Sequence, residues 1–170
     1  QLFVTSHSSN FASIAELNSL TCLIEKDKQV CSYFPRNAVF DVKESEHKKK
    51  LKKLERYLDV TKAELFFARK LVFVEGAAEQ MLMNALAKRA GNGFDLRKHA
   101  VSLISVEGLN FDCFLPILGD KGLPIPVSVV TDADPGKEED DNGNAQPVYP
   151  ALDDAVEISS NTQSLKKKYE

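Results

Sequence analysis

Short apolar segments alternate with helix-length segments through the middle of the chain, and this pattern predicts an α/β fold. Leu71–Val74 is an apolar run rich in β-branched residues, with the length of a strand that is covered on both faces. Similar runs follow at residues 99–105 and 126–131. Strands joined by helix-length connections lie parallel in one sheet, with right-handed crossovers. We therefore predict three parallel strands in one sheet flanked by helices.

The connecting segments show the spacing of helices. After the turn at Glu75-Gly76, one apolar helix face is formed by Met81, Leu82, Ala85 and Leu86. A second helical pattern runs from Leu109 to Leu118 and ends at residues 119–122, which contain two glycines. These two segments are the expected crossover helices.

The segments before the central strand predict smaller elements. Residues 1–10 are expected to form an apolar strand that runs into a polar turn, and residues 11–14 begin a short helix. Residues 21–40 alternate apolar and polar side chains, which is typical of antiparallel strands. From residue 44 strong helix formers predict a helix, and the stretch from Asp59 to Thr61 offers a cap for a further short helix.

Beyond the third predicted strand the sequence becomes more polar. Residues 136–144 are polar and turn-forming, and they predict a mobile loop. Ser160 or Asn161 is a suitable cap for a last helix, which would reach Lys168.

Composition narrows the class of protein. With 170 residues and 43% hydrophobic composition, the chain can bury one core with a smaller appendage. The net charge of −3 argues against a generally basic nucleic-acid coat but allows a local basic patch. No apolar run reaches membrane-spanning length, and no signal peptide precedes the first strand-like segment. We therefore expect a soluble, cytoplasmic protein, and a fragment of a longer chain.

The three cysteines, Cys22, Cys31 and Cys113, are too few and too scattered for a disulfide framework or a zinc site. Reduced thiols are the expectation. Cys22 and Cys31 would face one another only if a hairpin forms around residues 26–28.

Four carboxylates at two predicted strand ends are the candidate chemistry. Glu75 follows the first strand and Glu79 lies one helical turn later, while Asp132 and Asp134 follow the third strand and share one side of an extended chain. Such acids repel one another unless cations lie between them, and Mg²⁺ or Mn²⁺ prefers oxygen ligands. The plainer interpretation is that each acid caps a helix or meets water.

Basic residues are concentrated in the run 48–53. Such a run is often a solvated helix face, yet it is the densest positive charge available to meet phosphates. We take as candidate DNA contacts Lys49 and Lys50 of this run, together with Arg97 and Lys98, because loops around strand ends can bring them to the rim of the acidic site.

Three blocks in the same order carry a resemblance to a known family. Residues 54–69, Val72–Glu79 and Val129–Asp134 are similar to the OLD (overcoming lysogenization defect) family of ATP-dependent nucleases, and the likeness runs from residue 1 to 134. In that family an ABC-type ATPase is joined to a Toprim nuclease domain, whose glutamate and Asp-x-Asp motifs bind divalent metal.

The resemblance implies roles for individual residues. Glu75 matches the Toprim glutamate, Glu79 the second acid of a Glu-Gly-x-x-Glu pattern, and Asp132 and Asp134 the Asp-x-Asp pair. His7 resembles the ATPase switch histidine. The implied catalytic residues are Glu75, Asp132 and Asp134, all four acids are implied ligands of two Mg²⁺ or Mn²⁺ ions, and the implied reaction is two-metal hydrolysis of a phosphodiester.

The resemblance also implies a domain order. Residues 1–43 would be the end of an ABC-type ATPase domain, residues 44–69 a helical linker, and residues 70–170 a Toprim nuclease domain without its last strand. The chain has no phosphate-binding loop, Walker B strand or ABC signature, so ATP would be used only by the full-length protein. A homodimer and a role in phage defence are implied for that protein.

Two alternatives remain open beside a metal-dependent DNA endonuclease. One is a catalytically incomplete module for DNA binding or dimerisation, in which the acids are structural. The other is a different Toprim phosphoryl-transfer enzyme, such as a relative of primases or topoisomerases.

Overall fold

The structure, a computed structural model, describes residues 2–37, 45–119, 122–132, 136–139 and 143–148. These residues fall in two units, Gln1–Val130 and Thr131–Glu170. The predicted last helix, with Ser160 or Asn161 as its cap, lies outside the described residues. No helix in the described part of the chain is long and apolar enough to cross a membrane.

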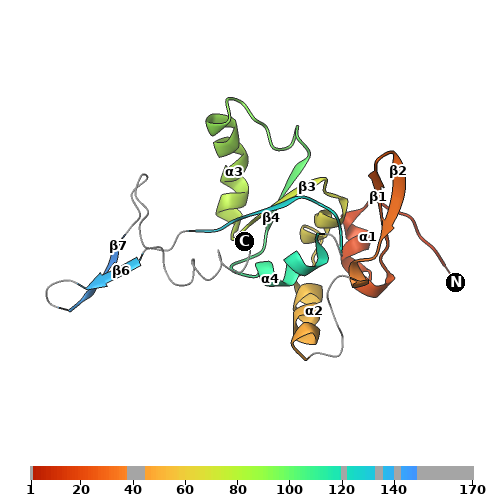
Figure 1. Ribbon diagram of the computed structural model, residues 1–170, viewed down its shortest axis with the longest axis horizontal. Coiled ribbons are helices and arrows are strands. Elements are labelled where there is room, and N and C mark those ends of the chain that lie inside the picture. Colours follow the sequence, from red (N-terminus) through yellow and green to blue (C-terminus); the bar gives the residue numbers. More distant parts are fainter. Residues whose placement is uncertain (1, 38–44, 120–121, 133–135, 140–142, 149–170) are drawn as a thin grey trace. The chain divides into compact units, whose positions relative to one another are not determined.

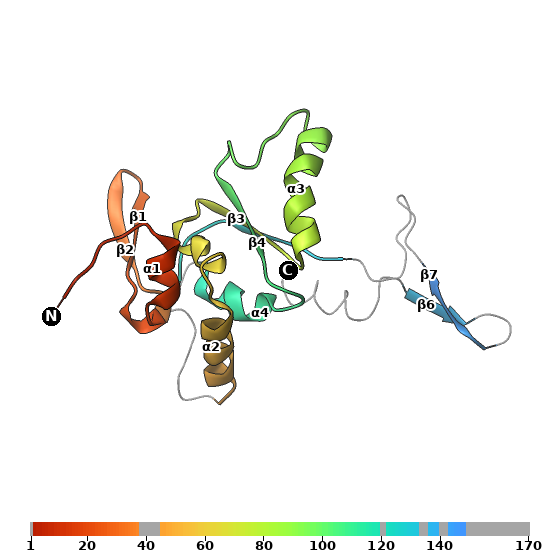
Figure 2. The same ribbon diagram turned by 180° about the vertical axis from the view of Figure 1, so that it is seen from behind.

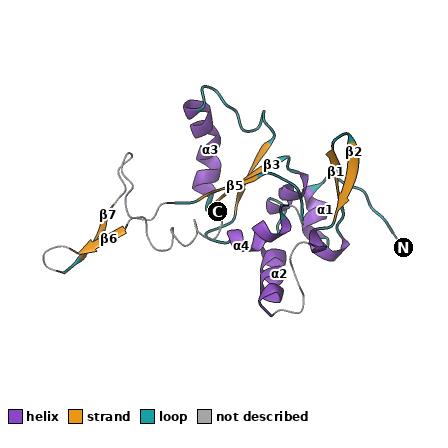
Figure 3. Cartoon of the chain, in the orientation of Figure 1, coloured by secondary structure: helices purple, strands orange, loops and turns teal. Residues whose placement is uncertain are grey.

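A three-stranded parallel sheet with the order β4-β3-β5 is the centre of the first unit (Figure 3). The middle strand is β3, Lys70–Val74, and its neighbours are β4, Val101–Ser105, and β5, Val127–Val130. Both pairings are parallel, with Leu71 opposite Ser102 on one side and opposite Val127 on the other. The prediction of three parallel strands is confirmed.

Helices flank this sheet on both faces (Figures 1 and 2). On one face lies α3, Ala77–Ala90. On the other lie α4, Phe111–Phe114, and the short 3-10 helix η4, Leu115–Ile117. Alternation along β3 directs Phe73 toward α4, where its ring lies 5.8 Å from the ring of Phe114. This contact lies in the core of the unit, because both rings are fully buried.

The predicted apolar face of α3 exists but is not buried. Met81, Leu82 and Leu86 are 80%, 57% and 55% exposed, and no residue of α3 is buried. The helix instead turns a partly polar stripe toward its neighbours. The side chain of Gln80 donates to the Leu103 carbonyl of β4 at 2.8 Å, and Asn84 accepts from the backbone N–H of Leu96 at 3.1 Å. These hydrogen bonds select the side of α3 that meets the rest of the unit.

The amino-terminal part forms its own small elements. Helix α1 is Ser9–Ile14, η1 is Leu17–Ser19, and η2 is Pro35–Asn37. Between them β1, Cys22–Lys26, and β2, Gln29–Tyr33, form a separate antiparallel sheet, as the alternation predicts. The expected strand at the start of the chain is wrong, because residues 2–8 have no regular structure. No described strand pairs with them, and an isolated strand leaves its backbone groups unpaired.

The hairpin places Cys22 and Cys31 two residue pairs apart along the ladder. Cys22 lies opposite Tyr33 and Cys31 opposite Ile24, so the two thiols are diagonal neighbours, and both are free. Burial raises the pKa of the Cys22 thiol to about 11, and burial likewise raises that of Cys113 to about 11. All three cysteines are free in this structure, and their reduced state stays a prediction.

The segment between hairpin and sheet consists of α2, Ser45–Tyr57, and the 3-10 helix η3, Lys62–Phe67. Leu54 of α2 and Leu58, which directly follows the helix, are buried, so this end of α2 packs against the rest of the unit. Lys53 of α2 lies 3.5 Å from Asp112 of α4. The segment is thereby packed against the helical layer under the sheet.

The second unit contains a two-stranded antiparallel sheet of β6, Gly136–Glu139, and β7, Ala145–Val148. The prediction of a loop at residues 136–144 is wrong for its first four residues, which form β6. The prediction of a loop used the polar composition of the segment, which says nothing about backbone pairing. The segment is a strand because its backbone pairs with β7.

We expect Phe73→Ala to destabilise the first unit strongly. It removes a fully buried ring from the contact with Phe114, and such a cavity costs about 3–5 kcal/mol. Met81→Ala is the matched control, because this side chain is 80% exposed and its truncation should change stability by no more than about 0.5 kcal/mol. Urea denaturation of both variants measures the difference, and equal losses would contradict this account of the core.

Candidate functional site

A cavity of about 260 Å³ opens beside the carboxyl ends of β3 and β4. Its polar lining residues come from the start of η3 with the residue before it, from the turn after β3 and the first part of α3, and from the end of β4 with the turn after it. These polar residues are Thr61, Lys62, Glu75, Gln80, Ser105 and Glu107. The carboxyl ends of parallel strands are where α/β sheets form their sites, because the connecting loops diverge there.

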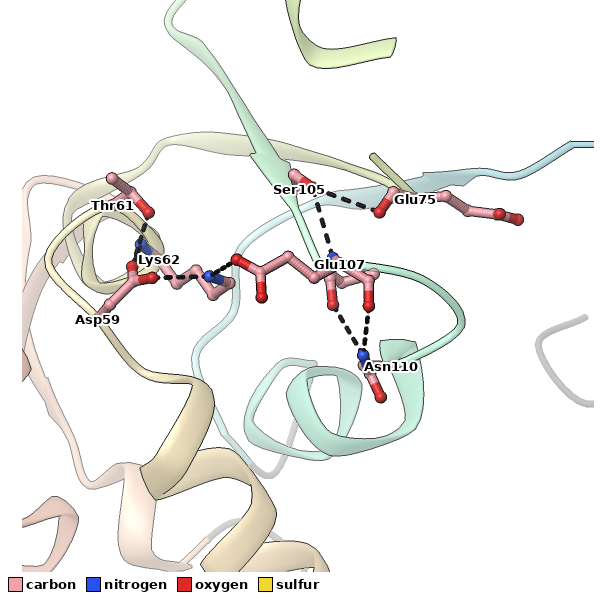
Figure 4. A network of polar contacts seen from close by, with 8 residues as sticks. Asp59, Thr61, Lys62, Glu75, Ser105, Glu107 and Asn110 are labelled. Carbon is pink, nitrogen blue, oxygen red and sulfur yellow. Dashed lines mark hydrogen bonds and ion pairs between the residues drawn. The ribbon is translucent and has the colours of Figure 1, made fainter. Parts of the chain in front are cut away.

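Glu75 lies where the sequence predicts it, directly after β3, and it is one of the residues that line this cavity, with its side chain extended away from Lys62 and Glu107 (Figure 4). The residue is half-buried. Its carbonyl oxygen accepts two hydrogen bonds from the turn after β4, one from the Gly108 N–H at 2.8 Å and one from the Ser105 hydroxyl at 3.3 Å. The backbone of Glu75 is therefore fixed by the neighbouring strand end.

Glu79 has a defined contact at the start of α3. Its Oε2 accepts from the backbone N–H of Gly76 at 2.9 Å, which caps one of the unpaired amides at the helix start. Glycine at 76 fits this contact, because a Cβ there would lie 2.9 Å from the same oxygen. The plainer interpretation, a helix-capping acid, thus describes one oxygen of Glu79. Its role as a metal ligand stays a prediction.

The sequence did not reveal an ion-pair group that includes two of the residues lining the cavity, Lys62 and Glu107 (Figure 4). Lys62 at the start of η3 lies 2.7 Å from Asp59 and 2.8 Å from Glu107. Asp59 also accepts from the Lys62 backbone N–H at 2.9 Å, which confirms the predicted cap. Glu107-Gly108 repeats, after β4, the Glu-Gly turn that follows β3, and this repeat was the available signal.

The charges of this group are mutually stabilised. Burial, the largest single influence, lowers the pKa of Lys62, but hydrogen bonds and charge from Asp59 and Glu107 raise it above its usual value. For Asp59 burial raises the pKa, and the contacts with Lys62 and Thr61 outweigh it and lower the pKa to about 2. Lys62 is therefore an ammonium and Asp59 a carboxylate at neutral pH.

The other predicted acids belong to the second unit. Asp132 is exposed and follows the last residue of β5 by two positions, while Asp134 lies outside the described residues. Within the described part of the chain, no three Asp, Glu, His or Cys side chains gather as a metal site would require. The four-carboxylate site stays a prediction.

The predicted nucleotide and DNA residues lie elsewhere. His7 is exposed in the irregular segment before α1, and Lys49 is exposed on α2, whereas Lys50 is half-buried. Arg97 and Lys98 are exposed in the turn before β4. This turn is at the amino end of β4, opposite to the end that carries Glu107, so the expectation that it shares a rim with Glu75 is wrong. The parallel register separates the two ends by the length of the strand.

The three-stranded parallel sheet flanked by helices is consistent with a Toprim fold. Residues 66–134 form an OLD-like Toprim domain, because they match the family model described as "Overcoming lysogenization defect protein-like, TOPRIM domain". Toprim domains generally bind divalent metal ions, and the match supports a role in nucleic-acid cleavage or phosphoryl transfer. The resemblance noted from the sequence is confirmed for this region.

Comparison with solved structures finds the C-terminal region of the Burkholderia pseudomallei OLD protein. The sequences are 41% identical, the match covers 41% of this chain and 33% of that chain, and the TM-score is 0.38. The match thus spans about a third of that structure. Comparison with curated proteins finds no significant match.

We expect Asp59→Asn to lower stability in a pH-dependent way. The folded-state pKa of about 2 lies below the ordinary value of about 3.9, so the contribution is complete above about pH 4 and is lost as pH falls through about 2. The carboxylate is half exposed, so the loss at pH 7 should be only about 1 kcal/mol. Denaturation at pH 7 and pH 2 measures it, with Asp27→Asn in the exposed hairpin turn as control. A difference from wild type that is as large at pH 2 as at pH 7 would contradict the assignment, because about half of the Asp59 carboxyls are protonated at pH 2.

Proposed function

We propose that this chain carries the Toprim nuclease part of an OLD-like, ATP-dependent nuclease and hydrolyses DNA phosphodiester bonds with divalent metal ions. The observation that supports this best is the position of Glu75. It follows the middle strand of the parallel sheet, lines a cavity, and lies within the region that matches the Toprim family model. An acid at that point is the element that metal-dependent phosphoryl chemistry requires.

The donor chemistry of the site fits Mg²⁺ or Mn²⁺. The charged residues that line the cavity are Glu75, Glu107 and Lys62, so its lining has more acidic than basic residues. In the proposal Glu75, Glu79, Asp132 and Asp134 hold two ions through carboxylate oxygens. The ions would supply an activated water and offset charge on the leaving oxygen.

The protein's own contribution is to hold Glu75 in place and shape the cavity. The two hydrogen bonds to its carbonyl oxygen fix the backbone of Glu75, and this backbone carries the carboxylate that the reaction needs. Asp132 and Asp134 complete the acidic set in this proposal because they follow the strand directly beside β3. No protein nucleophile is needed for hydrolysis by water.

DNA would be attracted by exposed basic residues, because an acidic site alone repels a polyanion. Within the run 48–53, Lys48, Lys49 and Lys52 are exposed on α2, and these are better candidates than half-buried Lys50. Contacts of this kind would be made to phosphates and would read little base sequence. Arg97 and Lys98 would contact DNA from the opposite end of β4.

The remaining proposals concern the longer protein. In this proposal residues 1–43 end an ABC-type ATPase domain that contains the switch residue His7, residues 44–69 are a linker, and residues 70–170 belong to the nuclease domain. ATP hydrolysis, homodimer formation, a cytoplasmic location and a role in phage defence would be properties of that protein.

We expect Glu75→Gln to reduce nicking of supercoiled plasmid in Mn²⁺ by about 100-fold or more, because a neutral amide is a weaker ligand for a hard cation. Asp132→Ala should give a similar loss. DNA binding in the absence of cleavage should stay within about twofold, because phosphate contacts dominate it. Glu25→Gln, in the exposed β1, is the matched control.

The assay compares Mn²⁺ with a chelator. Nicking that survives chelation, or equal activity of Glu75→Gln and wild type, would refute the proposed function. A wild-type chain that binds DNA and Mn²⁺ yet never nicks would instead support the catalytically incomplete module.

We expect charge reversal at Lys48 and Lys49 to weaken DNA binding and flatten its salt dependence. Each lost phosphate contact removes about 0.9 from the slope of log affinity against log salt, so two lost contacts lower it by about two. The control reverses Lys26 and Lys28, which are exposed in the hairpin and change the net charge equally. Titration across a salt series decides, and equal effects of the two pairs would contradict a role for α2.

A further inference from the structure

Lys62 is a buried charged side chain beside the cavity. The residue is 3% exposed, whereas the carboxylates of its two partners, Asp59 and Glu107, are 51% and 61% exposed. Burying an ammonium is costly unless it is paired, and both partners lie within 2.8 Å of it. Such a group is a poor surface contact for a ligand. It is well suited to hold two segments together, because Glu107 lies 45 residues away in the sequence.

One of these segments, the turn after β4, has an unusual backbone. Glu107 has a φ of 55°, in the left-handed region that residues with a Cβ rarely adopt, and Gly108 follows with a φ of 92°. A conformation of this kind persists only where surrounding contacts enforce it. Two such contacts come from Asn110, whose amide donates to the carbonyls of Val106 and Glu107 at 3.1 and 2.6 Å. Lys62 supplies a third, at the Glu107 carboxylate.

The same turn is hydrogen-bonded to Glu75. The Gly108 N–H donates to the Glu75 carbonyl at 2.8 Å, and the Ser105 hydroxyl, which donates to that carbonyl, also accepts from the Glu107 N–H at 3.4 Å. A continuous set of contacts thus runs from η3 through Lys62, the turn after β4 and on to Glu75 (Figure 4).

We propose that Lys62 is a positioning residue for Glu75, which acts by fixing the turn Glu107-Gly108 through its ion pair with Glu107. The functional meaning of this inference rests on the proposed function, since it concerns the acid on which that function depends. The structural part of the inference does not rest on the proposed function, because it concerns only the hydrogen bond from the Gly108 N–H to the Glu75 carbonyl. Lys62 belongs to the segment directly after α2, so the segment before the sheet would set the geometry of the site.

The competing explanation is that Lys62 only stabilises the fold. Removal of its charge leaves two half-exposed carboxylates that water can solvate, so Lys62→Met should still fold. A general loss of stability would accelerate hydrogen exchange at all core amides alike. A loss of positioning would accelerate hydrogen exchange only at amides of the turn after β4.

The test is amide hydrogen exchange, measured by NMR on the full chain. The reporter is the Gly108 amide, bonded to Glu75, and the reference is the Leu71 amide, which donates to the Pro126 carbonyl at 2.9 Å on the other side of β3. We expect Lys62→Met and Glu107→Gln to accelerate exchange of Gly108 about tenfold with Leu71 within about twofold. Lys62→Arg keeps the charge and should restore protection.

Unchanged exchange at Gly108, or parallel acceleration of Gly108 and Leu71, would overturn the proposal, and so would an arginine variant that behaves like the methionine variant. Calorimetric titration with Mn²⁺ separates this result from the proposed function. Wild type that binds no Mn²⁺ counts against the metal site, while the exchange data still decide the role of Lys62. If wild type binds Mn²⁺, Lys62→Met should weaken the affinity and Lys62→Arg should retain it.

Discussion

The pairing of β3 with a strand on each side is the constraint on which the rest of the first unit depends. A middle strand must satisfy its backbone groups along both edges, and β3 does so with two parallel partners in fixed register. Its buried residues, Leu71, Phe73 and Val74, then meet the helical layers. Glu75 follows the last of them, so the position of the candidate catalytic acid is a consequence of how the core is paired and packed.

The sheet could be predicted because its signals are local and repeated. Apolar runs of strand length with helix-length connections leave few topologies other than parallel pairing. The face of α3 could not be predicted, since the spacing of Met81, Leu82 and Leu86 describes a helix but not its surroundings. The hydrogen bonds made by the side chains of Gln80 and Asn84 decide which side of the helix meets the rest of the unit. A prediction from the spacing of hydrophobic residues does not take such polar contacts into account.

Only part of the candidate site could be predicted from the sequence. Glu75 is marked by a strand end, a glycine and a helix start within a few residues, and Asp59 by the spacing of a cap. The contact between Lys62 and Glu107 joins segments that are remote in sequence, so the repeated Glu-Gly pattern marks the turn after β4 but does not identify Lys62 as its partner. Arg97 and Lys98 show the converse error. Both residues precede β4, whereas Glu75 follows β3. Because the two strands are parallel, the two basic residues lie at the end of the sheet away from Glu75.

The left-handed backbone at Glu107 has an evolutionary consequence. A side chain is tolerated at such a position because its carboxylate has a partner, and without that partner glycine would be the less strained residue. Positions 62 and 107 should therefore change together among related chains. A basic residue at 62 should accompany an acid at 107, and glycine or asparagine at 107 should accompany an uncharged residue at 62. The turn would then be maintained in such relatives by backbone preference, with no ion pair between the segment before the sheet and the end of β4.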